Sequence, residues 1–154
     1  MEIYLVRHGL AEPGDPYDQS RLLTERGQAQ AAGAARWIKQ QLSGAAQVWA
    51  SPYVRTQQTA QPIAAALCCE VETHGCLEPD QTPQKVVDDL VDQSGSIILV
   101  THLPLVGRLA SLLIDGQVMD QPWSPAEVWK LKGEVFASGC LDSSAVWYPV
   151  LEGI

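Results

Sequence analysis

Short apolar runs that end abruptly at polar residues constrain the fold of this chain more than any other feature. Residues 3–6 and 97–100 are continuous apolar runs, typical of strands buried on both faces, and residues 48–50 form a shorter run. From residue 25 to 42, apolar side chains recur every three or four positions, which is the pattern of an amphipathic helix. Strands that alternate with helices favour a parallel sheet covered on both faces, so the expected class is α/β.

Weaker signals extend this alternation to the end of the chain. Ser51-Pro52 is typical of a helix start, and Pro62 is expected to kink or split the helix that follows. We predict a three-layer αβα fold with a mainly parallel central sheet and an antiparallel C-terminal edge, in a single domain covering residues 1–154. The remaining expected strands are 70–73 and two or three of 128–132, 135–141 and 145–150, and the remaining expected helices begin at Thr82-Pro83 and at Pro104.

The charge balance argues against two classes of partner. The chain has 18 acidic and 10 basic residues and a formal net charge of -8, which opposes attraction to nucleic acid or to an anionic membrane surface. No apolar run is long enough to span a bilayer, and the first residues lack the pattern of a secretory leader. We therefore expect a cytoplasmic protein with no nucleic-acid or membrane partner.

The four cysteines indicate neither a zinc site nor a disulfide framework. Cys68, Cys69, Cys76 and Cys140 show no CxxC pair with a companion pair, which is the usual spacing of a structural zinc site. A cytosolic chain of this size also has no need of covalent cross-links. Reduced, partly buried thiols are the expectation.

Polar side chains follow each predicted parallel strand at the point where the strand ends. In open α/β sheets the ligand crevice lies beyond the carboxyl ends of the strands, so we expect these side chains to converge. They are Arg7 and His8 after the first strand, Ser51 and Arg55 after the second, Glu78 and Asp80 after the third, and Thr101 and His102 after the fourth.

Two arginines and two histidines in one crevice indicate phosphoryl transfer. Arginine binds phosphate oxygens with paired N–H donors and stays charged, so Arg7 and Arg55 are expected to clamp the group. A neutral imidazole is a competent nucleophile toward phosphorus, and the charge of Arg7 beside His8 favours that neutral form. His102 adds a donor for the equatorial oxygens. The residues predict a phosphatase with His8 as the nucleophile.

Other interpretations of the same residues stay open. Taken singly, a histidine after a strand or an arginine on a helix is more often structural than catalytic. A metal pair is disfavoured, because no carboxylate lies at ligand spacing beside either histidine and because Arg7 and Arg55 would repel a cation. A noncatalytic module that only binds phosphate would keep the arginines and dispense with His8. We expect an enzyme that uses neither a metal nor a cofactor.

Four segments, in this order, resemble the histidine phosphatase superfamily, also called phosphoglycerate-mutase-like. They are residues 5–9 (LVRHG), 21–27 (RLLTERG), 51–60 (SPYVRTQQTA) and 100–102 (VTH). The shortness of the chain and residues 101–107 (THLPLVG) are most similar to the SixA-type phosphohistidine phosphatases of that superfamily. The resemblance covers about the first two thirds of the chain.

This resemblance implies a role for each matching residue. His8 would become phosphorylated, while Arg7, Arg55 and His102 hold the phosphoryl group. The implied substrate is phosphohistidine on a partner protein, such as a histidine-containing phosphotransfer domain of a signalling relay. No metal is implied in this chemistry.

The alternative within the superfamily is a small-molecule phosphomonoesterase. An alkoxide is a poor leaving group, so ester hydrolysis requires an acid that protonates it. Glu78 is the candidate acid, and Asp80 lies beside it in the sequence. A phosphohistidine substrate needs this acid less, because imidazole leaves in neutral form near neutral pH.

Overall fold

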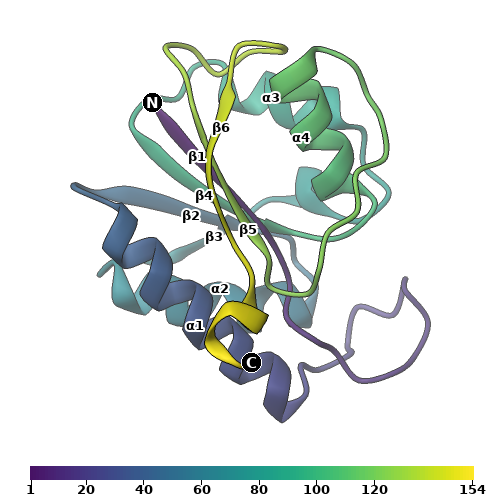
Figure 1. Ribbon diagram of the computed structural model, residues 1–154. Coiled ribbons are helices and arrows are strands. Elements are labelled where there is room, and N and C mark those ends of the chain that lie inside the picture. Colours follow the sequence, from purple (N-terminus) through teal and green to yellow (C-terminus); the bar gives the residue numbers. More distant parts are fainter.

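The computed structural model describes residues 1–154 and contains one sheet of six strands. The strands are β1 (Glu2–Arg7), β2 (Ala46–Ala50), β3 (Val71–Thr73), β4 (Ser96–Thr101), β5 (Val128–Lys132) and β6 (Asp142–Trp147). Their order across the sheet is β3-β2-β4-β1-β5-β6 (Figure 1). The first four strands run parallel to one another, whereas β5 and β6 are antiparallel. The predicted mainly parallel sheet with an antiparallel edge is confirmed.

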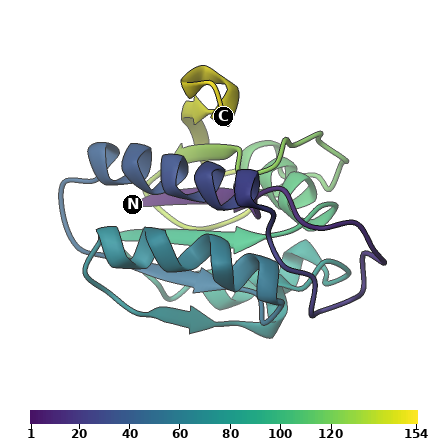
Figure 2. The same cartoon turned by 90° about the horizontal axis from the view of Figure 1, so that it is seen from below.

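Helices cover both faces of this sheet. They are α1 (Glu25–Gln41), α2 (Val54–Ala66), α3 (Pro83–Leu90) and α4 (Leu105–Asp115), with short 3-10 turns η1 (Gly75–Leu77) and η2 (Pro149–Glu152). Figure 2 shows α1 and α2 side by side on one face, and Figure 1 shows α3 and α4 on the other. The predicted three-layer αβα arrangement is therefore confirmed. None of the helices has the length and apolar character needed to cross a membrane.

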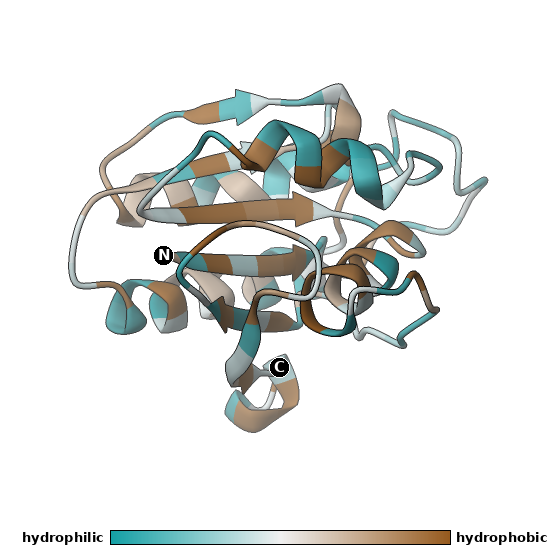
Figure 3. Ribbon diagram, turned by 90° about the horizontal axis from the view of Figure 1, so that it is seen from above, coloured by the Kyte–Doolittle hydropathy of each residue, from teal (hydrophilic) through white to brown (hydrophobic).

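Alternating side chains of the central strands fill two separate cores. On β1, Ile3 and Leu5 point toward α3 and α4, whereas Tyr4 and Val6 point toward α1 and α2. All four are fully buried. This two-sided burial explains why the sequence shows continuous apolar runs in these strands. Figure 3 shows the same pattern, with predominantly hydrophobic strands in the middle of the sheet.

The helix starts follow from local hydrogen bonding. Thr24 caps α1, because its Oγ1 accepts a hydrogen bond from the Gly27 backbone N–H at 2.9 Å. Helix α2 begins two residues later than Ser51-Pro52 suggested, and its N-cap Tyr53 makes no side-chain cap. Pro62 was expected to kink or split α2; the helix continues through Pro62 without a break, so the split does not occur.

The C-terminal third departs furthest from the prediction. Residues 135–141 form no strand, because their backbone N–H groups bond to the end of α4: Gly139 donates to the Leu112 carbonyl and Leu141 to the Leu113 carbonyl. Gly139 takes a positive φ of 70°, which turns the chain there. The last strand spans Asp142–Trp147, so it begins and ends three residues before the expected 145–150.

Candidate active site

The ends of β1 and β4 bring the two predicted histidines together. Arg7 pairs with Thr101 in the parallel register, so His8 and His102 leave neighbouring strands at the same level. The His8 backbone N–H donates to the Thr101 carbonyl at 3.0 Å. The two imidazole rings meet edge to face with centroids 5.3 Å apart. The structure therefore places His8 and His102 side by side, as the sequence predicted.

Hydrogen bonding determines which nitrogen of His8 carries the proton. Its Nδ1 lies 2.7 Å from the Gly9 carbonyl oxygen, and because a carbonyl only accepts, Nδ1 must carry the proton. The lone pair is therefore on Nε2. That atom accepts a hydrogen bond from Nε of Arg55 at 3.4 Å, so it faces the guanidinium group. The orientation is that required of a nucleophile directed at a group held by Arg55.

His8 is neutral near pH 7, chiefly because it is buried. Burial, aided by the charges of Arg7 and Arg55, lowers the pKa of His8 to about 3 against the opposing effect of the hydrogen bond to Gly9. We expected Arg7 alone to supply this effect. The structure adds a larger cause, since only 8% of the His8 surface is exposed.

His102 is held by a hydroxyl relay. Its Nε2 lies 2.7 Å from Ser51 Oγ, which is 2.6 Å from Thr56 Oγ1. The Thr56 hydroxyl lies 2.9 Å from the Tyr53 carbonyl and 3.0 Å from the Ser51 carbonyl, so its one proton goes to a carbonyl. The Ser51 proton then goes to Thr56, and Ser51 Oγ accepts from Nε2 of His102.

This relay leaves the lone pair of His102 on Nδ1. That nitrogen is buried and has no hydrogen-bond partner. Burial, followed by the neighbouring His8 and Arg55, lowers the pKa of His102 to about 2. His102 is thus neutral, and its Nδ1 can donate to a phosphoryl oxygen only after taking up a proton.

Two arginines flank the histidines, and backbone carbonyls hold them. Arg7 donates from one terminal nitrogen to the Trp123 carbonyl at 2.6 Å, and its buried Nε has no partner. Arg55 donates to the carbonyls of Asp18 and Pro16 at 2.9 and 2.7 Å. Arg7 Nε and His102 Nδ1 are the only buried side-chain nitrogen or oxygen atoms without a partner. An unpaired buried polar group is costly, so their occurrence in one cluster is typical of a binding site.

The structure brings Glu78 to the edge of this cluster. Thr101 Oγ1 donates to the Leu77 carbonyl at 2.6 Å, which ties η1 to the end of β4. Glu78 follows directly and is half-buried, whereas Asp80 is exposed. Burial raises the pKa of the Tyr53 hydroxyl, and the charges of both carboxylates raise it further. The Tyr53 ring lies edge to face with His102, with centroids 4.8 Å apart.

Sequence reasoning missed three residues that support the site. Thr59 Oγ1 accepts from the Gly9 backbone N–H at 3.0 Å and donates to the Arg55 carbonyl at 2.8 Å, so it joins the nucleophile turn to α2. Thr59 lies four residues after Arg55 in the helix, so the sequence alone could have shown that the two side chains share one helix face. Arg21 lies close enough for its charge to lower the pKa of His8, His102 and Arg55.

Glu127 is the third of these residues, and no pattern in the sequence distinguished it. Its buried carboxylate accepts from the Ser124 backbone N–H at 2.8 Å and from the Trp129 indole at 2.6 Å. Its charge also acts favourably on Arg7. Glu127 thus fixes the loop whose Trp123 carbonyl binds Arg7.

Glycines allow the nucleophile turn to lie against α1. A Cβ atom on Gly27 would lie 2.0 Å from the Leu10 carbonyl oxygen, and one on Gly9 would lie 2.5 Å from the Gly27 carbonyl oxygen. Both contacts are far inside van der Waals distance and involve backbone atoms. Only glycine permits so close an approach, which explains why positions 9 and 27 are both glycine.

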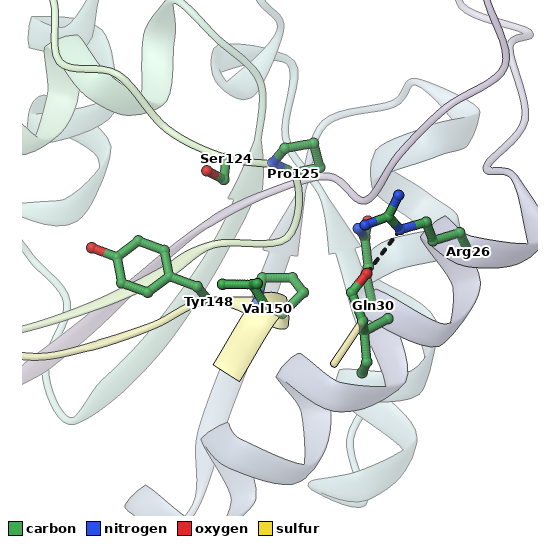
Figure 4. Close-up of a pocket in the computed structure, with 8 residues that line it drawn as sticks. Arg26, Gln30, Ser124, Pro125, Tyr148 and Val150 are labelled. Atoms are coloured by element: carbon green, nitrogen blue, oxygen red, sulfur yellow. Dashed lines mark hydrogen bonds between the residues drawn. The ribbon is translucent and has the colours of Figure 1, made fainter. Parts of the chain in front are cut away.

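A separate hollow of about 180 Å³ lies between the start of α1 and the C-terminal turn η2 (Figure 4). Arg26 and Gln30 line it from α1, and Arg26 Nε donates to the Ile154 carbonyl at 2.8 Å. None of the histidine cluster lines it. We therefore assign the chemistry to the histidine cluster, where the unpaired polar atoms lie.

Comparison with known proteins decides the family. The family model "Histidine phosphatase superfamily (branch 1)" matches residues 3–78. A phosphohistidine phosphatase SixA homolog from Haemophilus influenzae is 34% identical over 126 residues, which is 73% of this chain and 77% of the relative. The chain belongs to the histidine phosphatase superfamily.

Two further members of this superfamily support the assignment. Phosphohistidine phosphatase SixA from Escherichia coli is 28% identical over 125 residues, or 76% of each chain. A solved structure of the protein histidine phosphatase SixA, complexed with tungstate, has a TM-score of 0.86 at 25% identity and covers 99% of both chains. The superfamily match includes His8 and Arg55, and the structural match extends over β5 and β6 as well.

Proposed function

We propose that this protein is a phosphohistidine phosphatase that hydrolyses phosphohistidine on a partner protein through a phospho-His8 intermediate. One observation carries the proposal: the unprotonated Nε2 of a neutral, buried His8 accepts a hydrogen bond from Arg55, with Arg7 and His102 beside it. The names of the two SixA relatives support the choice of substrate. The tungstate in the related solved structure supports binding of a tetrahedral oxyanion.

The first chemical step is an in-line attack by His8 Nε2 on phosphorus. A P–Nε2 bond forms as the P–N bond of the substrate breaks, and the electron pair of that bond stays on the substrate nitrogen. The other nitrogen of the substrate ring carries a proton near neutral pH, so the leaving group is neutral imidazole. The His8 ring acquires positive charge, which the Nδ1–H bond to the Gly9 carbonyl offsets. In the second step water attacks phosphorus, the electron pair of the P–Nε2 bond returns to His8, and the water proton passes to the product phosphate.

The surrounding cations compensate the charge of the transferred group. In a loose transition state negative charge spreads over the three equatorial oxygens, and fixed donors are the main source of catalysis. We propose that Arg7, Arg55 and a protonated His102 donate to those oxygens. Arg21 supports them by its charge. For this to happen, Arg55 must exchange some of its bonds to loop carbonyls for bonds to phosphate.

The partner we propose is a phosphorylated histidine-containing phosphotransfer protein or domain. An imidazole leaving group departs in neutral form near neutral pH, so cleavage does not depend on a well-placed acid. A cytoplasmic location is part of the proposal, and it is supported by four free cysteines. We also propose that residues 1–154 act as one domain, since β5 and β6 join the same sheet as the motif strands.

Hydrolysis of small phosphomonoesters is the second candidate function. It is favoured by one observation, the placement of Glu78 beside Tyr53 and the end of β4. In that case Glu78 would protonate the departing alkoxide. Asp80 is the matched control, because it is exposed and lies two residues after the half-buried Glu78.

Comparative kinetics test these two candidates. We expect kcat/KM for a phosphohistidine-bearing phosphotransfer domain to exceed that for phosphosugars and phosphoamino acids. Glu78→Gln should lower ester hydrolysis at least about tenfold while leaving phosphohistidine hydrolysis nearly unchanged, because only the ester needs the acid. Asp80→Asn should alter neither rate. Faster turnover of esters than of phosphohistidine would contradict the proposed substrate, and an ester rate insensitive to Glu78→Gln would remove Glu78 from the mechanism.

A further inference from the structure

Three potential metal ligands from different parts of the chain meet outside the histidine cluster. They are His74, which follows β3, Cys76 in η1, and Asp89 in α3. The three ligand atoms, one from each side chain, all lie within 4.8 Å of one another. The proposed mechanism uses none of the three.

The surroundings of the cluster fix two of these side chains and leave the third free to adjust. Cys76 is 6% exposed, and the half-buried His74 ring stacks on Trp49 with centroids 4.0 Å apart. Asp89 is exposed, so solvent and ions reach the cluster from its side. A second carboxylate lies nearby, with Glu72 Oε1 3.9 Å from His74 Nε2.

The donor set selects the class of ion. A thiolate, an imidazole and a carboxylate are the ligands of zinc, whereas magnesium and calcium take oxygen alone. Ligand atoms around a tetrahedral zinc are roughly 3.5 Å apart, so a small rotation of the exposed Asp89 closes the site. Lys85 lies near Cys76 and opposes a cation, but the carboxylates of Asp89 and Glu72 together with the thiolate outweigh one positive charge.

We propose that His74, Cys76 and Asp89 form a Zn²⁺ site. Burial and the neighbouring Asp89 raise the pKa of the Cys76 thiol to about 12, so the sulfur becomes a thiolate only when the entering metal displaces its proton to solvent. Glu72 supplies either an outer carboxylate for His74 or the fourth ligand. Bound zinc joins β3, η1 and α3, and it therefore braces the segment that carries Glu78. This proposal departs from the expectation that the chain holds no metal, which rested on cysteine spacing and on the lack of a carboxylate and the repulsion by Arg7 and Arg55 at the predicted histidine pair.

Zinc competition with the full-length protein tests the site. The protein, stripped with a chelator, is titrated with Zn²⁺ in the presence of a chromophoric chelator, and separately with Co²⁺ while its absorption spectrum is recorded. We expect one zinc per chain and a near-ultraviolet thiolate-to-cobalt band. Asp89→Asn and Cys76→Ser should weaken zinc binding at least about tenfold. Two variants are the matched controls and should bind zinc as the wild type does. They are Asp88→Asn, at the residue of α3 just before Asp89, and Cys140→Ser, at an exposed cysteine.

Two results would overturn the proposal. One is a wild-type protein that does not withhold zinc from the chelator. The other is equal zinc affinity for Asp89→Asn and Asp88→Asn with no thiolate band, which would place any bound metal elsewhere. Because Asp89 is exposed, its variant reports on binding even if Cys76→Ser does not fold. The measurement uses no substrate, so its outcome is independent of the proposed phosphatase activity.

Discussion

His8 and His102 are both buried in neutral form, and this makes the folded protein sensitive to mild acid. Their pKa values are lowered from 6.5 to about 3 and about 2, so below pH 6.5 the unfolded chain binds protons that the folded chain does not. The stabilisation that the two neutral rings give should therefore be fully present above pH 6.5. Below that, the free energy of unfolding should fall by about 1.4 kcal/mol per pH unit for each ring as the pH drops toward 3. Urea unfolding at about pH 7 and about pH 5.5 measures this slope.

Variants separate the buried histidines from other titrating groups. His8→Asn should remove about half of the pH dependence that the pair contributes. His102→Asn should remove the other half, because the two rings are the pair buried in neutral form. An identical slope in wild type and His8→Asn would mean that burial does not hold His8 neutral.

The tautomer of His102 leads to a second prediction at the residue scale. Because Ser51 accepts from Nε2, the buried Nδ1 has no proton to donate to an oxyanion in the free protein. Binding of tungstate should therefore draw up to about one proton from solution, since the anion raises the pKa of His102. Calorimetry in buffers of different ionisation enthalpy measures this uptake. It should vanish in His102→Asn, and no proton uptake by the wild type would refute the assigned tautomer.

At the scale of elements, the packing of α1 against the nucleophile turn determines whether His8 is held correctly. Gly27→Ala should destabilise the protein by about 1–3 kcal/mol and lower kcat, because the added Cβ forces the Leu10 backbone away from α1. The gain in helix propensity from alanine, about 1 kcal/mol, is smaller than this. Urea unfolding and steady-state kinetics check both effects.

Gly44→Ala is the matched control for that substitution. Gly44 follows α1, and a Cβ there meets nothing within 4 Å. We expect stability within about 0.5 kcal/mol of wild type and unchanged kinetics. A Gly27→Ala protein as stable and active as Gly44→Ala would show that the close approach is dispensable.

The strands also show where apolar patterns in the sequence predicted an element correctly and where they did not. Strands buried on both faces, such as 97–100, are continuous runs of large apolar residues, so their positions were predictable. Residues 135–141 are apolar for a different reason: Phe136 and Leu141 fill the core beside α4 from a loop. Periodicity does not distinguish these two cases, because both bury apolar side chains.

At the scale of the whole molecule, the topology of the sheet explains why the site residues could be predicted. Parallel strands end at one edge, so the polar residues after them converge whatever the intervening helices do. Arg7, His8 and His102 were found in this way. Glu127 and Trp123 were not, because they reach the site through a loop before an antiparallel strand, and the rule about parallel strand ends does not apply to them.

Trapping of a phosphoenzyme tests the central claim most directly. The protein is mixed with a labelled phosphohistidine-bearing phosphotransfer domain and quenched in alkali, which preserves phosphohistidine. The account predicts one phosphoryl group per chain, on His8 of the three histidines, lost on acid treatment, absent from His8→Asn and retained in His74→Asn. Label that persists in His8→Asn, or substrate turnover by that variant at the wild-type rate, would contradict the account.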